Sequence, residues 1–182
     1  IVFEKNEKPG GMLTYGIPSY KLEKDVVEAE IDIIRTLGVE IKCGVEVGKD
    51  ITLDELRKDG YEAFYIAIGC QGSRKSGVDG EDADGVMSAV DILHEIAENH
   101  DLDLKGNKTV VIGGGNVAVD VARSTKRCGA DVLGMFCLES REEMPASEEE
   151  IFETEDEGIQ INNGWGVKEI LAEIGRASCR ER

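Results

Sequence analysis

The chain has 182 residues, of which 41% are hydrophobic, with 22 glycines and a formal net charge of -17. This length and composition are typical of an α/β protein with a buried core and argue against a disordered chain. The negative charge argues against nucleic-acid binding, because a phosphate backbone is neutralised by clustered Lys and Arg, and the sequence contains no such cluster. Acidic runs such as residues 148–150 are interpreted as solvated helix faces.

The sequence has no run of about 18 apolar residues and no recognisable signal peptide, so we expect no membrane insertion and a cytoplasmic protein. Its cysteines show no C-x-x-C spacing, which predicts neither a zinc site nor a redox dithiol. We expect the first four to be buried as small hydrophobes; the five are Cys43, Cys70, Cys128, Cys137 and Cys179.

The first forty residues predict strand, loop, helix and strand in that order. Residues 1–4 are typical of a buried strand that is already under way at the first residue. Residues 6–20 contain several Gly and Pro residues, which predict a loop. Apolar residues at helical spacing predict an amphipathic helix over residues 22–37 that stops at Gly38, and residues 39–43 form a short strand.

The next segment predicts a short helix followed by a central strand. Thr52 and Glu55 have the spacing of a capping box, so a helix should begin there and end near Gly60. Residues 61–68 are mostly apolar and run into Gly69, which is typical of a strand buried on both faces. Residues 86–99 are expected to be helical.

The following residues predict a β-turn-α-β unit. Residues 108–112 form a β-branched strand that meets three glycines, residues 116–127 favour a helix, and residues 132–138 favour a second strand. A helix near 147–156 and a strand near 159–162 continue the alternation. The pattern predicts an α/β fold with parallel sheets flanked by helices.

Both ends of the chain suggest a fragment of a longer protein. The first residue lies inside a predicted strand, without a Met or a preceding turn. At the other end, residues 174–182 (IGRASCRER) turn abruptly basic and resemble the translation of a sequencing-library adapter. We therefore expect a non-native tail over residues 174–182 and exclude it from the predicted fold.

The strongest motif lies between the strand and helix of the β-turn-α-β unit. It fits G-x-G-x-x-A, in which Gly113 permits a tight turn, Gly115 lets the backbone approach a pyrophosphate, and Ala118 allows close helix packing. The amides of the helix N-terminus would bind the phosphates. The alternative is a merely tight strand-to-helix turn. The predicted nucleotide-binding residues of this motif are Gly113, Gly114, Gly115, Asn116, Val117 and Ala118.

The end of the following strand should decide which nucleotide binds, because the adenosine ribose lies there. A carboxylate such as Glu139 accepts hydrogen bonds from ribose hydroxyls and repels a 2'-phosphate, which favours NAD(H) over NADP(H). Ser140 and Arg141 follow in the same predicted site, and Arg141 keeps NADP(H) open because its side chain could reach a phosphate. The alternative for Glu139 is an ordinary loop carboxylate.

Glu4 stands in a corresponding place at the end of the first strand. It suggests a second ribose-binding carboxylate, whose glycine fingerprint would lie upstream of residue 1. An exposed surface Glu is the alternative.

Several motifs together resemble the glutamate synthase small (beta) subunit family and related FAD-dependent, pyridine nucleotide-disulphide oxidoreductase-like proteins. They are GGML (10–13), YGIP (15–18), KDVV (24–27), VGKDIT (47–52), GGGNVAVD (113–120) and EMPA (143–146). The resemblance covers residue 1 to about residue 171. It implies two incomplete Rossmann-like domains: a partial FAD domain with a connecting segment over residues 1–104, and a partial NAD(P) domain over residues 105–173.

The resemblance also implies cofactor contacts in the FAD domain. Glu4 would hold the FAD ribose, and Val47 would meet the adenine through its backbone. Two groups of residues would lie along the rest of the cofactor. The first would line the flavin and comprises Gly10, Gly11, Met12, Leu13 and Ile17, and the second matches a segment beside FAD and comprises Ala67, Ile68, Gly69 and Arg74.

The sequence departs from the family pattern in ways that affect function. Ile68 replaces a Thr whose hydroxyl could bond the cofactor. Leu138 and Glu139 stand where NADP-using members carry paired Arg, which strengthens the expectation of NAD(H). The cysteine-rich region that binds iron-sulfur clusters is not in this sequence, so clusters are expected only in a missing region or in a partner.

The resulting hypothesis is a flavoprotein oxidoreductase fragment that passes hydride from NADH (or NADPH) to FAD and electrons on to iron-sulfur clusters or a catalytic partner subunit. We predict no catalytic side chain and no metal ligand, because the cofactors carry the chemistry; His94 and His100 are interpreted as surface or packed residues. Two alternatives stay open, a catalytically silent dinucleotide-binding module and the glutamate synthase small subunit proper using NADPH. A thioredoxin-reductase-like enzyme is disfavoured, since it needs C-x-x-C.

Overall fold

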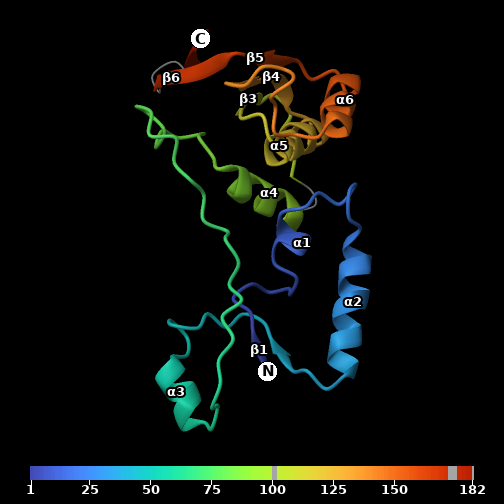
Figure 1. The fold of residues 1–182 in the computed structure, drawn as a ribbon, viewed down its shortest axis with the longest axis vertical. Coiled ribbons are helices and arrows are strands. Elements are labelled where there is room, and N and C mark those ends of the chain that lie inside the picture. Colours follow the sequence, from blue (N-terminus) through green and yellow to red (C-terminus); the bar gives the residue numbers. More distant parts are fainter. Residues whose placement is uncertain (100–101, 172–175, 182) are drawn as a thin grey trace. The chain divides into compact units, whose positions relative to one another are not determined.

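The computed structural model describes residues 1–99, 102–171 and 176–181. The chain divides into two compact units, Ile1–Gln71 and Gly72–Arg182, here called the N-terminal and the C-terminal unit. Both contain parallel strands and helices, which confirms the predicted α/β class (Figure 1). The division falls after Gln71, so residues 72–99 and 102–104 belong to the C-terminal unit. The assignment of FAD and NAD(P) domains stays a prediction.

The N-terminal unit has a minimal sheet. β1 (Val2–Phe3) pairs in parallel with β2 (Ile41–Lys42), with Val2 opposite Ile41. The connection holds α1 (Met12–Tyr15) and α2 (Lys24–Thr36), and α3 (Leu53–Lys58) follows β2. The expected strand, helix and strand are therefore present, although each strand is only two residues long.

Helix α2 matches its sequence pattern but its apolar face is uncovered within this unit. The helix ends at Thr36, and Gly38 follows with a φ of +91°, as expected for a glycine that terminates a helix. Val27 is its buried residue, whereas Ile33 is 55% exposed. The N-terminal unit therefore buries only part of the apolar face of this helix.

Helix α3 begins with the predicted capping box. The Thr52 hydroxyl accepts a hydrogen bond from the Glu55 amide at 3.2 Å, and the Glu55 carboxylate accepts one from the Thr52 amide at 2.8 Å. The Thr52 hydroxyl also donates to the Glu55 carboxylate at 2.7 Å, and this bond, together with the one from the Thr52 amide, holds the pKa of Glu55 below its usual value because both favour the ionised carboxylate. This local prediction is confirmed.

The prediction of a central strand over residues 61–68 is wrong. These residues form no strand, and Tyr65 and Ile68 are 94% and 82% exposed. A strand is defined by pairing with a neighbour, and the apolar run has no pairing partner among the described residues of the N-terminal unit. The residues of this run therefore favour a strand, but the N-terminal unit offers no partner, among its described residues, with which a strand could pair.

The predicted loop over residues 6–20 contains one regular turn. The breakers Gly10 and Gly11 lie before the four residues of α1, and Gly16 and Pro18 lie after them. The expectation of irregular structure is thus wrong for Met12–Tyr15. Tyr15 is buried, and its hydroxyl accepts a hydrogen bond from the Lys8 amide at 2.9 Å.

The C-terminal unit is built on a parallel sheet in the order β3-β4-β5. β3 (Lys108–Ile112) is joined to β4 (Asp131–Cys137) by α5 (Asn116–Arg127), and β4 to β5 (Ile161–Asn163) by α6 (Glu148–Asp156). Figure 1 shows the two helices beside this sheet. The predicted β-turn-α-β unit is confirmed, with the ends of β3 and α5 at the predicted residues.

The pairing of β3 with β4 contains a bulge. Thr109 lies opposite Val132, but Val110 lies opposite Gly134, so Leu133 is an extra residue on β4. Gly134 has a φ of +154°, and a Cβ on it would lie 3.0 Å from Nδ2 of the Asn162 side chain. Glycine is therefore required at the bulge both for backbone conformation and for space.

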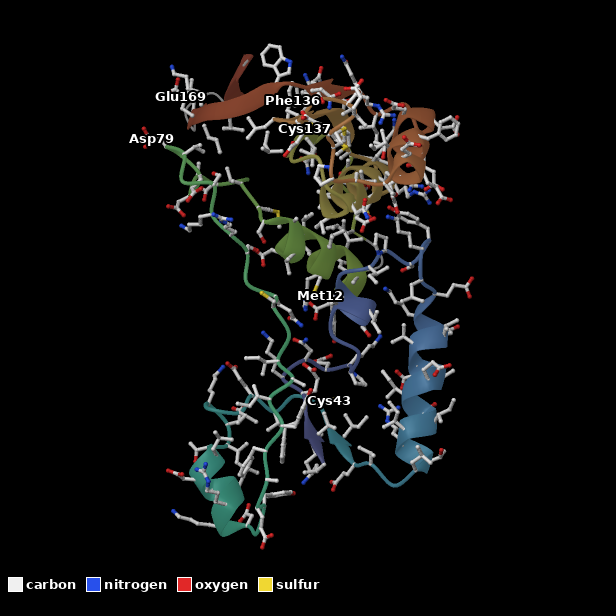
Figure 2. All side chains as sticks on the ribbon, viewed as in Figure 1. Met12, Cys43, Asp79, Phe136, Cys137 and Glu169 are labelled. Atoms are coloured by element: carbon white, nitrogen blue, oxygen red, sulfur yellow. The ribbon has the colours of Figure 1, made fainter. Side chains whose placement is uncertain are left out.

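Three further elements complete the C-terminal unit. Helix α4 (Ala89–Glu98) is capped by the Ser88 hydroxyl, which accepts from the Asp91 amide, and packs on α5. β6 (Trp165–Leu171) pairs antiparallel with β7 (Arg176–Glu181), so the tail that we excluded from the fold takes part in a hairpin. Asp79 forms an isolated bridge with Glu169 on β6 (Figure 2).

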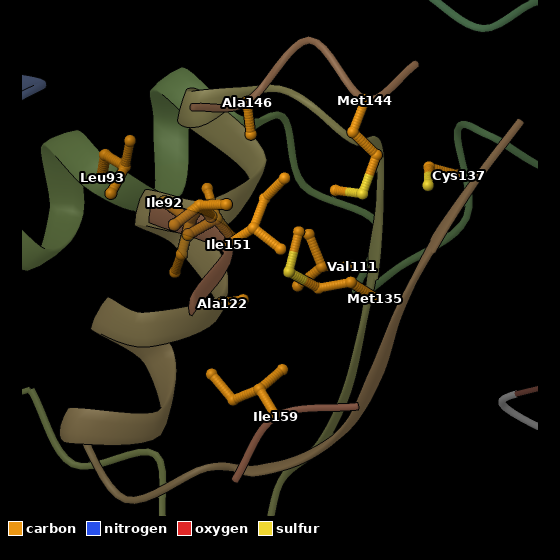
Figure 3. Close-up of a cluster of buried hydrophobic side chains, with 12 residues drawn as sticks. Ile92, Leu93, Val111, Ala122, Met135, Cys137, Met144, Ala146, Ile151 and Ile159 are labelled. Carbon is orange, nitrogen blue, oxygen red and sulfur yellow. The ribbon is translucent and has the colours of Figure 1, made fainter. Parts of the chain in front are cut away.

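A single hydrophobic core lies between this sheet and its helices (Figure 3). Its fully buried large side chains are Met135, Ile151, Ile159 and Val119. Burial of each side chain of this size stabilises the fold by about 1.5–3 kcal/mol. The core holds β4 against α5 and α6, and thus fixes the loop between β3 and α5.

The cysteines differ in how far the structure buries them. Cys137 is buried as expected, Cys43 and Cys128 are half-buried, and Cys70 is exposed, which contradicts its expected burial. The exposed Cys70 follows the unpaired run 61–68, so no neighbouring strand covers it. Burial raises the pKa of the Cys137 thiol. His94 lies on α4 beside Glu98, whereas His100 and the side chain of Cys179 lie outside the described residues.

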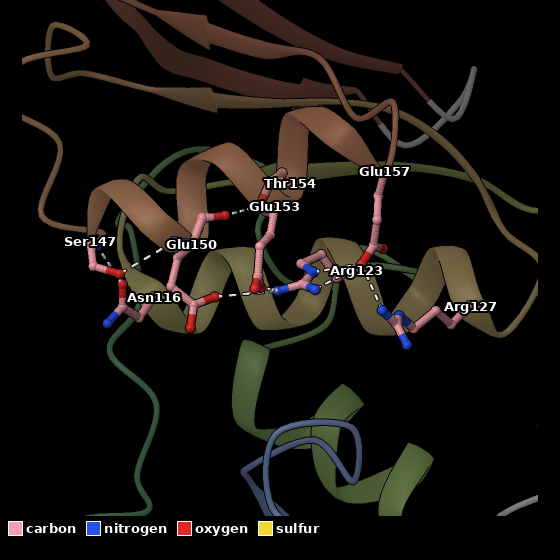
Figure 4. Close-up of polar contacts among 8 residues, drawn as sticks. All are labelled: Asn116, Arg123, Arg127, Ser147, Glu150, Glu153, Thr154 and Glu157. Atoms are coloured by element: carbon pink, nitrogen blue, oxygen red, sulfur yellow. Dashed lines mark hydrogen bonds and ion pairs between the residues drawn. The ribbon is translucent and has the colours of Figure 1, made fainter.

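An ion cluster ties α6 to α5 (Figure 4). The Arg123 side chain is 6% exposed and pairs with Glu153 at 2.5 Å and Glu157 at 2.8 Å, with Glu150 further away at 3.5 Å. Glu157 also pairs with Arg127 at 2.7 Å. Burial raises the pKa of Glu157, but the hydrogen bonds from Arg127 and Arg123 outweigh it and leave that pKa below its usual value. The acidic run 148–150 is therefore a solvated face at its first two residues only.

Candidate functional site

The glycine loop connects the last residue of β3 to the first turn of α5. Gly113 has a φ of +137°, and its amide donates to the Phe136 carbonyl at 2.9 Å. A Cβ on Gly113 would lie 3.2 Å from the Cβ of Ala118. This contact explains why a small residue at position 118 lets the helix pack closely against the turn, as the motif predicts.

Gly114 brings the loop against the end of β4. A Cβ at this position would lie 2.9 Å from the Cβ of Cys137 and 3.2 Å from Oε2 of Glu139. A side chain at position 114 would therefore collide with the end of the strand. The sequence pattern assigned no task to Gly114, whereas the structure makes it the point where the glycine loop meets the carboxylate of Glu139.

Gly115 leaves open space at the N-terminus of α5. A Cβ on it would find only Cγ of Pro145 nearby, at 3.8 Å, and no side chain caps the helix among the residues that the structure describes. The first amides of a helix lack partners within the helix and bind anions readily. The space and the uncapped amides fit a dinucleotide pyrophosphate.

The segment after β4 is attached to the same loop. The Ala146 amide donates to the Gly114 carbonyl at 3.1 Å, and the Ser147 amide donates to Oδ1 of Asn116 at 3.0 Å (Figure 4). The Ser147 hydroxyl then accepts from the Glu150 amide and caps α6. The EMPA motif thus has a structural role that spacing alone did not reveal: it holds one side of the glycine loop.

Glu139 is anchored through its backbone. Its carbonyl accepts hydrogen bonds from Nδ2 of Asn163 at 3.1 Å and from the Gly164 amide at 3.3 Å. These bonds leave the carboxylate beside Gly114. Asn163, at the end of β5, was not identified from the sequence, because no motif links an Asn on the third strand to a carboxylate on the second.

Ser140 and Arg141 lie in the turn that follows. The Ser140 hydroxyl donates to Glu143 at 3.0 Å, and Arg141 pairs with Glu155 on α6 at 3.4 Å. The guanidinium is therefore engaged by a carboxylate of the neighbouring helix. Glu139, and not Arg141, is the charged side chain placed against the glycine loop.

The predicted FAD residues of the N-terminal unit gather in part. Glu4 directly follows β1, and its carboxylate accepts a hydrogen bond from the backbone amide of Asn6 at 2.8 Å. Gly10 and Gly11 have positive φ values of +112° and +52°, and a Cβ on Gly10 would lie 2.2 Å from the Thr14 hydroxyl. A Cβ on Gly11 would have only Nε2 of Gln71 nearby, at 3.7 Å, so this face of the loop is open enough for a cofactor to approach.

The other predicted FAD residues are not brought to this loop. Val47 forms an isolated bridge with Ile51 and is exposed. Ala67, Ile68 and Gly69 lie on the unpaired run, and Arg74 belongs to the C-terminal unit. Their role in binding FAD stays a prediction.

Over residues 1–99, 102–171 and 176–181, no group of three or more His, Cys, Asp or Glu side chains is arranged to hold a metal ion. Over the same residues, no helix is long and apolar enough to span a bilayer.

The chain matches one protein family over most of its length. Residues 5–178 match the family described as pyridine nucleotide-disulphide oxidoreductase. Among solved structures, FprA from Mycobacterium tuberculosis in complex with NADPH aligns with a TM-score of 0.71 at 18% identity, over 98% of this chain and 59% of that one. Thioredoxin reductase from T. acidophilum aligns with a TM-score of 0.60 at 19% identity, over 98% and 64%. At these identities the likeness shows the fold alone.

Curated relatives are oxidoreductase subunits. The chain is 42% identical to "NADP(+)-dependent formate dehydrogenase subunit beta" of Moorella thermoacetica, over 96% of this chain and 25% of that protein. It is 32% identical to "Glutamate synthase [NADPH] small chain" of Escherichia coli, over 100% and 43%. It is 37% identical to "NADPH-Fe(3+) oxidoreductase subunit beta" of Geobacter sulfurreducens, over 84% and 23%. The chain thus spans less than half the length of these relatives.

Proposed function

Because this chain belongs to the pyridine nucleotide-disulphide oxidoreductase family, and so has an oxidoreductase role, we propose that it takes hydride from a nicotinamide dinucleotide held at Gly113–Ala118. FAD held by the N-terminal unit accepts the hydride, and the electrons pass on to an acceptor outside this chain. One observation carries the proposal: the uncapped N-terminus of α5 stands beside Gly114 and the carboxylate of Glu139.

The chain's residues bind and orient the dinucleotide. The amides at the start of α5 donate to the pyrophosphate, and Gly115 lets the phosphates approach the backbone. Ala146 holds the opposite side of the loop through the Gly114 carbonyl. FAD and nicotinamide supply the hydride acceptor and donor when bound, so no acid or base side chain is required.

Binding of FAD falls to the residues around α1. The glycine pair at positions 10 and 11 leaves one face of the loop open, and Met12 and Leu13 present exposed apolar side chains beside it. Apolar side chains of this kind suit the flat face of a flavin ring. Glu4, at the end of β1, is proposed to accept hydrogen bonds from the FAD ribose.

We further propose that NADH is preferred over NADPH. A carboxylate at position 139 binds ribose hydroxyls and repels a 2'-phosphate, and its backbone is fixed by Asn163 and Gly164. The names of the relatives refer to NADP(+) or NADPH, so this chain would differ from them in its nucleotide. The ion pair with Glu155 opposes the use of Arg141 for a 2'-phosphate.

The acceptor is proposed to be a set of iron-sulfur clusters or a catalytic partner subunit. The relatives carry the names subunit beta and small chain, which supports a role within a larger assembly. Within the described residues no cluster-binding group occurs, so the clusters would be held elsewhere.

Anaerobic reduction of bound flavin by NADH and by NADPH tests the proposal. We expect faster reduction by NADH in the wild type. Glu139→Arg should reverse the preference. Glu139→Gln should lower the ratio of the reduction rate with NADH to that with NADPH by roughly tenfold, the size expected for the loss of one charge-assisted hydrogen bond. Glu142→Gln, in the same exposed turn, is the control and should leave the ratio unchanged. A wild type that prefers NADPH would overturn the role of Glu139.

The second candidate is a silent dinucleotide-binding module. The open apolar face of α2 and the unpaired run 61–68 favour it for this chain taken alone, because the N-terminal unit presents few buried contacts. Binding of NADH without any uptake of FAD would support this candidate.

A further inference from the structure

Lys24 occupies a place where a lysine is locally unfavourable. It is the first residue of α2, and the N-terminus of a helix carries partial positive charge, which disfavours a cation there. Burial lowers its pKa, because the ammonium group is partly removed from water. A residue that breaks local preferences in two ways usually serves another part of the structure.

The ammonium group of Lys24 is directed at the loop around α1. It donates to the carbonyl of Leu13 at 2.8 Å and, more closely, to the carbonyl of Ile17. These carbonyls lie within and just beyond the last turn of α1, where backbone oxygens have no partner inside the helix. One lysine therefore ties the end of α1 and the chain after it to the start of α2.

The other end of the same loop is fixed separately. The Thr14 hydroxyl donates to the Pro9 carbonyl at 2.7 Å, and the Lys8 amide donates to the Tyr15 hydroxyl. A four-residue helix cannot be stable by itself, because the entropy lost in ordering the first turn exceeds the free energy gained from the few hydrogen bonds of that turn. Thr14 and Tyr15 are held by these bonds, and the carbonyls of Leu13 and Ile17 by the bonds from Lys24.

We propose that Lys24 is the positioning residue of the flavin loop: by holding the carbonyls of Leu13 and Ile17, it keeps residues 10–17 in the conformation that receives FAD. The inference rests on the proposed function, since it takes this loop as the flavin site. Lys24 acts through the loop backbone and is not itself a catalytic residue.

Three variants test the role. Lys24→Met keeps the length of the side chain and removes its hydrogen bonds, and Lys24→Arg keeps the charge and the donors. Lys49→Met, an exposed lysine of the same unit paired with Glu46 at 3.5 Å, is the matched control. FAD affinity is measured by titration of the apo protein at the flavin fluorescence, and backbone order by amide hydrogen exchange of residues 12–17 without FAD.

For Lys24→Met we expect FAD affinity to fall roughly tenfold or more, and exchange of residues 13–17 to rise by a similar factor, because two hydrogen bonds from a charged donor are lost. At saturating FAD its visible band should also change shape, since a displaced loop alters the surroundings of the ring. Lys24→Arg should restore most of each effect, and Lys49→Met should match the wild type.

The outcomes separate the inference from the proposed function. If the wild type binds no FAD, the proposed flavin site is wrong. If it binds FAD and Lys24→Met binds equally well, with the same band shape and the same exchange, the role of Lys24 is overturned. A variant that is less heat-stable but binds FAD with an unchanged band would show that Lys24 supports the fold only, and would also overturn the inference.

Discussion

The two units of the chain differ in how much of their structure is supported from within. The C-terminal unit has a three-stranded parallel sheet and a core whose central side chains are fully buried. The N-terminal unit has two strands of two residues each and leaves the apolar residues of α2 and of the run 61–68 exposed. Helix α2 forms as its pattern predicts although its apolar face is uncovered, whereas the run 61–68 forms no strand, because a helix makes its hydrogen bonds within itself and a strand needs a partner.

The largest expected effect comes from removing a core side chain of the C-terminal unit. Met135→Ala should lower the free energy of unfolding by about 2–5 kcal/mol, because it leaves a cavity under the sheet. Urea unfolding followed at Trp165, the single Trp, reports on this unit. Ile33→Ala on α2, followed by circular dichroism, should change stability by less than about 0.5 kcal/mol. If Met135→Ala and Ile33→Ala lowered the free energy of unfolding equally, the difference in internal support between the two units would be contradicted.

Arg123→Ala tests the ion cluster between α5 and α6. The loss leaves partly buried carboxylates without a cation, and we expect a cost of roughly 2–3 kcal/mol, below that of a fully buried pair because Glu153 is partly exposed. Lys49→Ala, which breaks an exposed pair with Glu46, should cost less than about 0.5 kcal/mol.

The same cluster predicts a pH dependence. The pKa of Glu157 is lowered in the folded state, so its contribution is present above the ordinary carboxyl pKa and is lost as pH falls through the folded pKa. The difference in stability between the wild type and Arg123→Ala should therefore shrink below about pH 4.5, the usual Glu value. A difference that is constant from pH 7 to pH 3 would contradict this account.

Gly115→Ala should separate binding from folding. The position has an extended backbone and open space, so the added methyl group should lower thermal stability only slightly, through the weaker preference of an N-cap for alanine than for glycine. It would stand where the pyrophosphate approaches, and affinity for NADH should fall roughly tenfold or more, as measured by calorimetric titration. Gly114→Ala is the counterpart, which should lose both stability and binding because its Cβ meets Cys137.

The smallest effect is expected at the cap of α3. Thr52→Ala removes the hydroxyl that accepts from Glu55 and should cost about 1 kcal/mol. The measurement is amide exchange over residues 53–58, since the loss is local. No change there would mean that packing of Leu56 alone maintains the helix.

These contrasts also explain what could be predicted from the sequence. The turn at Gly113 and the box at Thr52 were predictable because neighbouring residues determine them. The run 61–68 was not, because a strand depends on partners that lie elsewhere in a sheet. At the candidate site, Glu139 was predicted from its place after a strand. The bonds from Asn163 to the Glu139 carbonyl and from Lys24 to the Leu13 carbonyl were not predicted, because no motif links a side-chain donor to a particular backbone carbonyl.

The bulge at Gly134 sets the phase of the strand that leads into the site. Side chains alternate between the two faces of a strand, and the extra residue Leu133 shifts that alternation by one. As a result, the odd-numbered positions Met135 and Cys137 face the core, and Glu139, two residues after the end of the strand, lies beside Gly114. Because Leu133 lies outside the ladder, its deletion would leave Val132 opposite Thr109 and Met135 opposite Val111. The face on which the strand presents Cys137, and with it the place of Glu139, is therefore fixed by the pairing of β4 with β3 and not by the number of residues in β4.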